Sequence, residues 1–377
     1  MTITAPHHVP LAEGSSPYPT SGQAIRRPVT MSTAAEDYRD LLDRVAAEGL
    51  MERDVSWYVR RMVRLGLGFL GAGVLFVLLG QSWWQLLTAA LLSVLCTQAG
   101  FLAHDAAHRQ IFPHAKGNEW TARIVGNLFV GLSYGWWMNK HSKHHANPNK
   151  IGSDLDIKTG VVVFDPADAP KRRGLAGWFV KRQGWFFVPL LSLVALDLHG
   201  GSAIRVLDRK ARVPKRGAEI ALLAVHLIGL PVAVFSVCGL GLGFAFLGVH
   251  LALFGLYMGG AFAPNHKGMP LVPKDFRIDF LRRQVLMSRN VSGGWFIAVA
   301  MGGLNYQVEH HLFPTMSSRQ LGKSQPIVRA FCAERGIKYT ETTLFESYRI
   351  VVRYLNRVGL GDRDPFSCPI TAQLRTR

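Results

Sequence analysis

The amino-acid sequence predicts an all-α integral membrane protein in which four transmembrane helices form two hairpins beneath a cytoplasmic helical cap. Three observations predict this fold class. The 377 residues are 49% hydrophobic, and many apolar residues gather in four runs close to the ~20 residues that a spanning helix needs. The formal net charge is +18, yet the short connection inside each pair of runs carries no charge. Eight of the fourteen histidines stand in short clusters, which places a polar site in the cap.

The N-terminal part of the chain precedes the apolar runs. Residues 1–32 are rich in Pro, Ser, Thr and Gly and lack the apolar core of a signal peptide, so we expect a disordered cytoplasmic tail. Residues 33–64 should form cytoplasmic and juxtamembrane helices. The first of these is expected from Ala34 to Glu48, because Thr33 and Glu36 fit a capping box. Its apolar stripe should pack on the cytoplasmic body.

Two hairpins are expected, at residues 65–103 and 219–263. In the first hairpin, Gln81 and Ser82 leave room only for a tight turn. In the second hairpin, the turn should lie near Gly239. The four expected spans are Leu65–Gly80, Trp83–Ala103, Glu219–Cys238 and Leu240–Ala263.

The positions of Lys and Arg predict the orientation. The segment 104–218 contains eighteen of them, and others precede the first run and follow the fourth. Because basic residues favour the cytoplasmic side, both termini, the segment 104–218 and the segment 264–377 should be cytoplasmic. The sequence therefore predicts a multi-pass protein of the cell membrane. It contains no nucleic-acid-binding motif, and the positive charge is best explained by lipid surfaces and acidic ligands.

The segment Gly184–Leu198 competes with this topology because it is strongly apolar. It is only fifteen residues long and contains Pro189 and Asp197. If it crossed the membrane, the histidine clusters would be divided between the two sides. We therefore expect an interfacial helix, with Trp178 and Trp185 among the headgroups.

Three histidine clusters and one shorter fragment carry the candidate chemistry. They are His104–His108, His141–His145, Gln307–His311 and Asn265-His266. Residues at i, i+3 and i+4 share a helix face, so each cluster should project its imidazoles in one direction. One ion rarely takes eight imidazoles, so the set indicates two metal ions. Imidazole without thiolate suits Zn, Cu, Fe or Ni, and the four cysteines, which form no CxxC pair, are expected to be free thiols.

With these motifs, the chain resembles the integral-membrane fatty acid desaturases over roughly Val55 to Tyr348, and it is most similar to acyl-CoA desaturases of actinobacteria. Asn147-Pro148-Asn149 after the second cluster and Leu312-Phe313-Pro314 after the third also match. The resemblance implies a non-haem di-iron centre with ligands His104, His108, His141, His144, His145, His266, His310 and His311. It also implies that Asp105, Asn265, Gln307 and Glu309 orient these ligands, with Gln307 replacing the leading His of the commoner third cluster.

The implied reaction is the O2-dependent introduction of a cis double bond into an acyl chain, with acyl-CoA as the expected substrate. No catalytic residue is expected beyond the metal ligands. The chain has no His-Pro-Gly-Gly motif, no Cys set for an iron–sulfur cluster and no Rossmann fingerprint. No haem, flavin or nicotinamide is therefore expected on this chain, and electrons should come from a separate ferredoxin or flavin reductase.

Several alternatives remain open from the sequence. A lipid or alkane hydroxylase, or a ketolase, would share the histidine clusters. A haem-binding membrane anchor could use His226 and His250, and zinc could replace iron. Neither the position of the double bond, nine or five to six from the carboxyl end, nor the choice between acyl-CoA and acyl-lipid follows from these residues. Thr97 and Gly100 could set the depth of an acyl tunnel or simply pack helices.

Overall fold

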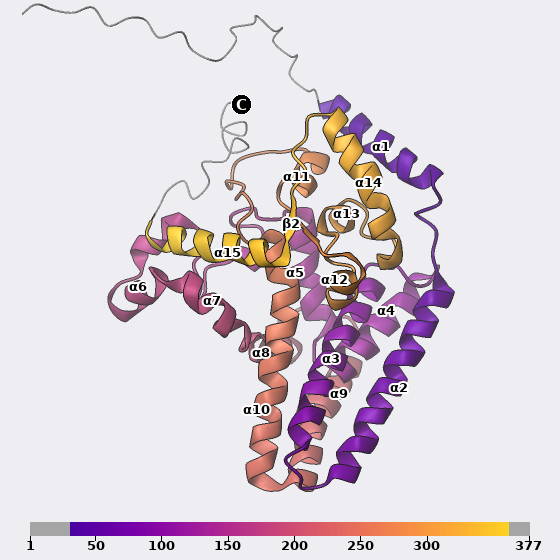
Figure 1. The fold of residues 1–377 in the computed structure, drawn as a ribbon, viewed down its shortest axis with the longest axis vertical. Coiled ribbons are helices and arrows are strands. Elements are labelled where there is room, and N and C mark those ends of the chain that lie inside the picture. Colours follow the sequence, from indigo (N-terminus) through magenta and orange to yellow (C-terminus); the bar gives the residue numbers. More distant parts are fainter. Residues whose placement is uncertain (1–30, 362–377) are drawn as a thin grey trace, which may run out of the picture.

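The computed structural model describes residues 31–361, and it is mostly helical (Figure 1). The lower part of the molecule in Figure 1 is a bundle of long apolar helices. Its members are α2 (Val55–Leu79), α3 (Gln85–Ala107), α9 (Arg216–Ala224), the π-helical turn η4 (Val225–Gly229) and α10 (Leu230–His266). Three stretches of the described chain are long and apolar enough to cross a membrane, namely α2, α3 and residues 216–266, which a break at Gly239 divides.

The upper part is built from shorter helices. It contains α1 (Met31–Ala47), α4 (Ala115–Ile124), η1 (Val125–Val130), α5 (Tyr134–Ala146), η2 (Leu155–Ile157), η3 (Pro166–Lys171), α6 (Gly174–Val180), α7 (Gln183–Leu191), α8 (Val194–Leu207), α11 (Phe280–Leu286), α12 (Gly294–Ala300), α13 (Gln307–Leu312), α14 (Ser318–Glu334) and α15 (Leu344–Gly359). Strands β1 (Asn290–Ser292) and β2 (Glu341–Thr343) pair in parallel.

The first helix differs at its start from the sequence prediction. It begins at Met31 rather than Ala34, so Thr33 lies inside the helix and is not its N-cap. Leu41 and Val45 are fully buried against residues of α11, α13 and α14, which confirms that this helix packs on the upper body. The predicted disordered tail falls almost wholly outside the described residues.

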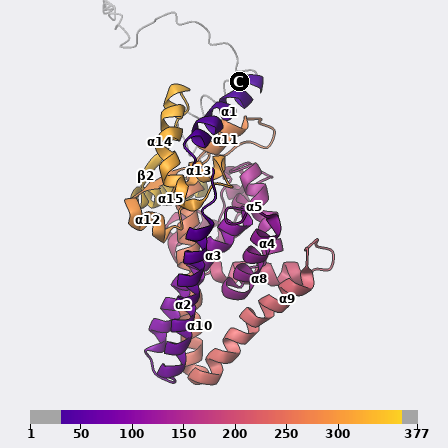
Figure 2. The ribbon, with the colours of Figure 1, turned by 90° about the vertical axis from the view of Figure 1, so that its right-hand side faces the viewer.

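The apolar helices also differ in their bounds. Asp54 caps α2 by accepting a hydrogen bond from the Trp57 amide (3.0 Å), so this helix starts ten residues before the expected span at Leu65. The connection to α3 covers residues 80–84, so Trp83 belongs to the turn rather than to a helix. Gly239 has φ 70° and interrupts α10, and Figure 2 shows the chain turning back at the bottom of the bundle. The glycine is needed there because a side chain strains this conformation.

The segment Gly184–Leu198 is not one continuous helix. It is divided between α7 and α8, which meet at an angle of 69° and which together could form one broken span or a re-entrant loop. Gly255 of α10 packs against this bend, where a Cβ atom would lie 2.8 Å from the Leu191 carbonyl oxygen. The break thus lies at a close contact between helices, which hydropathy alone does not predict.

A buried ion pair joins the start of the 216–266 stretch to the upper body. The Glu219 carboxylate is fully buried, lies 3.4 Å from Arg123 Nε and accepts a hydrogen bond from Ser133 Oγ (2.6 Å). The Gly135 amide also donates to it (3.2 Å). One carboxylate of α9 therefore joins that helix to α4 and to the start of α5.

We expect Glu219→Ala to lower the free energy of unfolding by roughly 3–5 kcal/mol, because Arg123 would be left buried without its counter-charge. Thermal unfolding of the detergent-solubilised protein would show this as a lower Tm. Glu48→Ala, at an exposed carboxylate of the connection after α1, is the matched control and should leave the Tm unchanged. An unchanged Tm for Glu219→Ala would contradict the stabilising role.

Candidate metal centre

The predicted histidines come from four elements that meet between the two parts of the molecule. His104 lies in the last turn of α3, and His108 follows it. The second cluster lies on α5, and His266 is the last residue of α10. The third cluster lies on α13. Figure 1 shows the ends of α3, α5, α10 and α13 close together where the long bundle joins the upper body.

The eight imidazoles form two groups, and within each group the candidate ligand nitrogens lie within 4.8 Å of one another. Two Nε2 pairs tie the first group together, His108 to His141 at 2.7 Å and His310 to His145 at 3.1 Å. In the second group, His144 Nε2 lies 3.2 Å from His266 Nε2. The first group is His104, His108, His141, His145 and His310, and the second is His144, His266 and His311.

This division corrects the expectation that each cluster points in one direction. His144 and His145 are adjacent on α5, yet they belong to different groups, and the same holds for His310 and His311 on α13. Successive residues on a helix are turned by about 100°, so adjacent side chains face different points. Two clusters therefore each serve both groups.

The imidazole rings of several candidate ligands are neutral, which is the protonation state that metal binding needs. Burial, helped by the neighbouring imidazoles, holds the pKa of His141, His145, His310 and His311 well below the usual histidine value. These rings are therefore neutral at pH 7 and keep a lone pair on one nitrogen. Among the described residues, Nε2 of His104 and Nε2 of His311 are buried and have no hydrogen-bond partner. Buried nitrogens without partners are costly unless an ion takes their lone pairs, so both groups fit metal ions.

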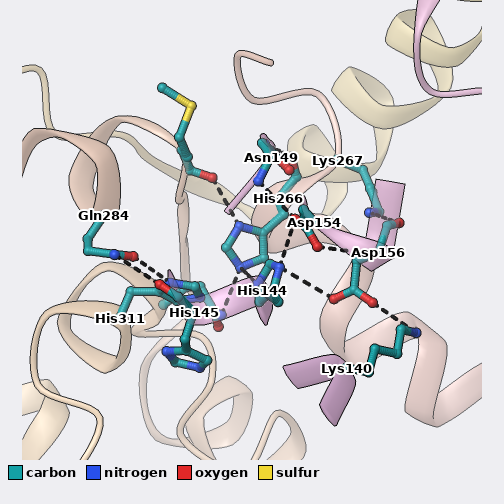
Figure 3. A network of polar contacts seen from close by, with 12 residues as sticks. Lys140, His144, His145, Asn149, Asp154, Asp156, His266, Lys267, Gln284 and His311 are labelled. Carbon is teal, nitrogen blue, oxygen red and sulfur yellow. Dashed lines mark hydrogen bonds and ion pairs between the residues drawn. The ribbon is translucent and has the colours of Figure 1, made fainter. Parts of the chain in front are cut away.

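The far ring nitrogens are held by the surrounding protein, as expected around metal ligands. His144 Nδ1 lies 2.9 Å from an Asp154 carboxylate oxygen, and His311 Nδ1 lies 2.9 Å from Gln284 Oε1. His266 Nδ1 donates to the Met287 carbonyl oxygen (3.0 Å). Figure 3 shows these contacts around His144, His266 and His311. They fix the orientation of the second group.

Asp154 and Gln284 were not found from the sequence. Asp154 lies in a loop ten residues after His144, and Gln284 lies on α11, far from every cluster along the chain. Neither stands at helical spacing from a histidine. A loop carboxylate shortly after a metal-binding cluster was the one signal available.

The four residues expected to orient ligands differ in what they contact. Asp105 lies 3.4 Å from His104 Nδ1 and pairs with Arg61 at 2.8 Å. Gln307 Nε2 lies 2.9 Å from His266 Nε2, and its Oε1 accepts from Asn265 Nδ2 (3.0 Å). Asn265 thus reaches a ligand only through Gln307.

Glu309 is fully buried and faces away from the imidazoles. Among the described residues, its carboxylate accepts hydrogen bonds from Asn290 Nδ2 (2.7 Å) and the Tyr339 hydroxyl (2.7 Å). Burial raises its pKa to about 7. Its contacts join α13 to β1 and to the segment before β2, so it holds the helix of the third cluster rather than a single ring.

A cavity of about 550 Å³ opens beside both histidine groups. His104 and His141 of the first group and His144 and His266 of the second line it. Its remaining wall is mainly apolar, with Leu132, Leu191, Leu198, Met258 and Phe262 among the lining residues. Gly100 lines the cavity, whereas Thr97 donates its hydroxyl to the Ser93 carbonyl oxygen (2.9 Å) and packs within the bundle.

The histidines of the alternative haem site have local partners. His226 Nδ1 donates to the Leu128 carbonyl oxygen (2.9 Å), and His199 Nε2 donates to that of Val130 (3.0 Å). Both carbonyls belong to the π-helical turn η1, whose widened backbone leaves carbonyl groups to be satisfied. His250 Nδ1 lies 3.2 Å from Ser93 Oγ. These contacts hold one nitrogen of each ring within the bundle, and Nε2 of His250 is buried with no hydrogen-bond partner among the described residues.

The chain is similar to proteins of known family. Residues 81–343 match the family model described as fatty acid desaturase. A Delta(6)-fatty-acid desaturase, fat-3, of Caenorhabditis elegans is 27% identical over 86% of this chain and 75% of its own length. A Delta(5) fatty acid desaturase, fat-4, of the same species is 27% identical over 86% and 74%. An acyl-lipid 8-desaturase of Rebecca salina is 31% identical over 68% of this chain and 59% of its own length.

These matches are to proteins of eukaryotes, and the expected similarity to actinobacterial acyl-CoA desaturases stays a prediction. The match to the family model extends from the turn before α3 to the end of β2, so it contains both histidine groups and the cavity wall. It covers well over half of the chain, and the long apolar helices agree with a membrane location. The chain therefore belongs to the fatty acid desaturase family.

Proposed function

We propose that this chain is an O2-dependent fatty acyl desaturase that introduces a cis double bond at a non-haem di-iron centre. The observation that carries the proposal is the position of the cavity, because two metal-binding groups of histidines border one apolar space. An acyl-CoA is the proposed substrate, and a separate ferredoxin or flavin reductase is the proposed electron source. Because some relatives are named acyl-lipid desaturases, an acyl-lipid is the substrate form to compare with acyl-CoA.

The protein's part is to hold the irons and to place the substrate. The two histidine groups would hold one iron each through neutral imidazoles, and bound iron would supply, with O2, the oxidising power that an unactivated methylene requires. Trp137 stacks on His141 with ring centroids 4.0 Å apart, and Phe262 lies 6.2 Å from His104. These rings form the apolar surface nearest the histidines. Because a strong oxidant attacks the nearest C–H bond, this wall determines which carbons react.

A charged group stands at the edge of the same cavity. Lys140 Nζ lies 2.8 Å from an Asp156 carboxylate oxygen, and Asp156 in turn lies 3.4 Å from His144 Nδ1. Lys267 donates to the Asp156 carbonyl oxygen (2.8 Å). Figure 3 shows this group beside His144 and His266. We propose that it receives the polar end of the substrate, which favours a double bond near the carboxyl end over position nine.

Lys140→Met is expected to raise KM for the acyl substrate about tenfold, because hydrogen bonds to charged groups contribute roughly 1.5–3 kcal/mol. The value of kcat should change much less, since no metal ligand is removed. Steady-state kinetics of the reconstituted enzyme would measure both. Lys116→Met, at an exposed lysine of α4, is the control. An unchanged KM would exclude Lys140 from substrate binding.

The orientation in the membrane is part of the proposal. The histidines, both termini and the helices of the upper body would lie on the cytoplasmic side, and the 80–84 turn and Gly239 on the other side. The basic residues of segment 104–218 support this orientation. Labelling of single cysteines in intact cells would test it, because a cysteine at position 82 should react from outside the cell and one at position 330 should not.

The first test is product analysis. The chain would be expressed with a reductase, and the fatty acids would be analysed by gas chromatography and mass spectrometry beside a His144→Ala control. A new alkene that is missing in the control would support desaturation and give its position. A new hydroxy acid would instead indicate a hydroxylase. Supplying acyl-CoA or acyl-lipid to the purified enzyme would then identify the substrate form.

Gln307→Ala is expected to lower activity less than His310→Ala does. The Gln307 amide contacts His266 and Asn265 and is a poor iron ligand, so its loss should disturb orientation without removing a ligand. Turnover and iron content of the two variants, measured side by side, would check this order. The reverse order would mean that Gln307 binds a metal directly.

A further inference from the structure

Helix α12 exposes apolar side chains on all of its free surface. Its sequence from Gly294 to Ala300 has no charged residue, and none of its seven residues is buried. Trp295 is 78% exposed and Phe296 is 70% exposed. Large aromatic side chains that stand together on a surface mark a site of contact with a partner or a membrane.

Two hydrogen bonds fix the position of α12 along the long helices. Gln98 of α3 donates to the Val299 carbonyl oxygen (3.1 Å), and Tyr257 of α10 donates to that of Ala300 (2.8 Å). Each donor lies nine residues before the end of its helix, which is about 13 Å along the helix axis. These two contacts place α12 beside the upper parts of α3 and α10 and not beyond their ends.

The surface below α12 continues the same apolar character. Val94 and Leu91 lie four and seven residues before Gln98, on the same face of α3, and are 47% and 38% exposed. Leu253 lies four residues before Tyr257 on α10 and is 39% exposed. Helix α12 is thus the upper end of an exposed stripe that runs down two helices long enough to cross a membrane.

A third aromatic residue joins this surface through the small sheet. Strands β1 and β2 are parallel, and Ser292 pairs with Thr343 at their ends. The carboxyl ends of both strands therefore lie at the same end of the sheet, and α12 and α15 begin there. Phe345, the second residue of α15, is 82% exposed. We call Trp295, Phe296 and Phe345 the aromatic rim.

A matching group of exposed apolar residues lies on α6 and α7. Leu175 is 89% exposed, Trp178 is 51% exposed and Trp185 is 71% exposed. Figure 1 places α6, α7 and α12 at a similar height, where the long bundle meets the upper body. Tryptophan is enriched at this level in membrane proteins because its ring suits the boundary between headgroups and acyl chains.

We propose that the aromatic rim is inserted into the interfacial layer of a lipid bilayer, with α12 lying against lipid beside α3 and α10. The absence of charge, the depth of α12 along the bundle and the continuous apolar stripe below it all identify lipid as the occupant. The chain after α12 passes through a buried turn at Gly302, which lies against Phe101 of α3, to the third histidine cluster. The bilayer therefore supports the segment that carries His310 and His311.

The test uses nitroxide labels on the full chain in lipid nanodiscs. Phe296→Cys and Phe345→Cys would be made in a Cys368→Ser background, because Cys96, Cys238 and Cys332 are buried. Relaxation by O2, which partitions into lipid, and by a water-soluble nickel chelate would be compared. Leu70→Cys, on the exposed face of α2, is the lipid control, and Ala330→Cys, exposed on α14, is the water control.

We expect both rim labels to relax mainly with O2, as the label at position 70 does. A label at 296 or 345 that responds mainly to the nickel chelate, as at position 330, would overturn the proposal. Poor access to both reagents would also overturn it, because a second copy of the chain would then cover the rim. Neither outcome depends on metal or activity, and two independent label sites guard against local misfolding.

Discussion

Replacing His310 or His144 by alanine is expected to abolish desaturation while leaving the protein in the membrane. His310 belongs to the first histidine group and His144 to the second, so each substitution damages one of the two proposed iron sites. Both side chains are buried and contact mainly the other histidine rings, so the main loss in each variant is a candidate metal-ligating nitrogen. Because the proposed reaction uses both irons, the loss of either site should remove product below detection.

Iron content and product should be measured together on the purified variants. We expect iron per chain to fall below that of the parent protein and no alkene to form when donor and substrate are supplied. His114→Ala is the control, because this histidine is exposed at the start of α4 and belongs to neither group. Full turnover in either ligand variant would show that the ligand assignment is wrong. Lost turnover with unchanged iron content would show that the histidine has a role other than binding iron.

The grouping of the histidines could be predicted largely because these candidate ligands obey local rules. Spacing of three or four residues on a helix is visible in the sequence, and it identified His104, His108, His141 and His145. What spacing did not show is the division into two groups. It follows from the rotation of about 100° between adjacent residues, so the split of His144 from His145 could have been inferred from the sequence as well.

The supporting contacts could not be predicted in the same way. Gln284 reaches His311 from another helix, and Asn290 reaches Glu309 from a strand of three residues. Such contacts depend on tertiary packing and leave no periodic pattern. The break between α7 and α8 likewise lies at a tertiary contact, where α10 approaches at Gly255. Hydropathy predicted where the apolar helices lie, but it did not predict where they begin, as at Val55 of α2 and Gln85 of α3.

Asp154 is the residue of this kind with the largest expected effect. Its carboxylate is buried, and one oxygen lies 2.9 Å from His144 Nδ1 and accepts from the Asn149 amide (2.8 Å). The other oxygen accepts from the Asp156 amide (2.9 Å). An ionised carboxylate can serve the imidazole and both amides because all of its lone pairs accept. It thereby fixes His144 with Nδ1 protonated and Nε2 free for metal.

Asp154→Asn should lower iron affinity or turnover roughly 10–100-fold, the usual cost of losing a partner of a metal-bound histidine. The amide NH2 must face either His144 Nδ1 or a backbone amide, and each choice places two donors together. Iron affinity would be measured by competition with a chelator, beside kcat and KM.

The matched control is Asp208→Asn, whose carboxylate caps a similar turn by accepting from the Lys210 amide (2.9 Å) far from any metal group. If Asp154→Asn kept the parent's iron affinity and kcat, then the imidazole of His144 would be positioned by its packing alone, since Asp156 lies farther away at 3.4 Å. A lower Tm with unchanged iron affinity would likewise assign Asp154 to the loop rather than to the metal.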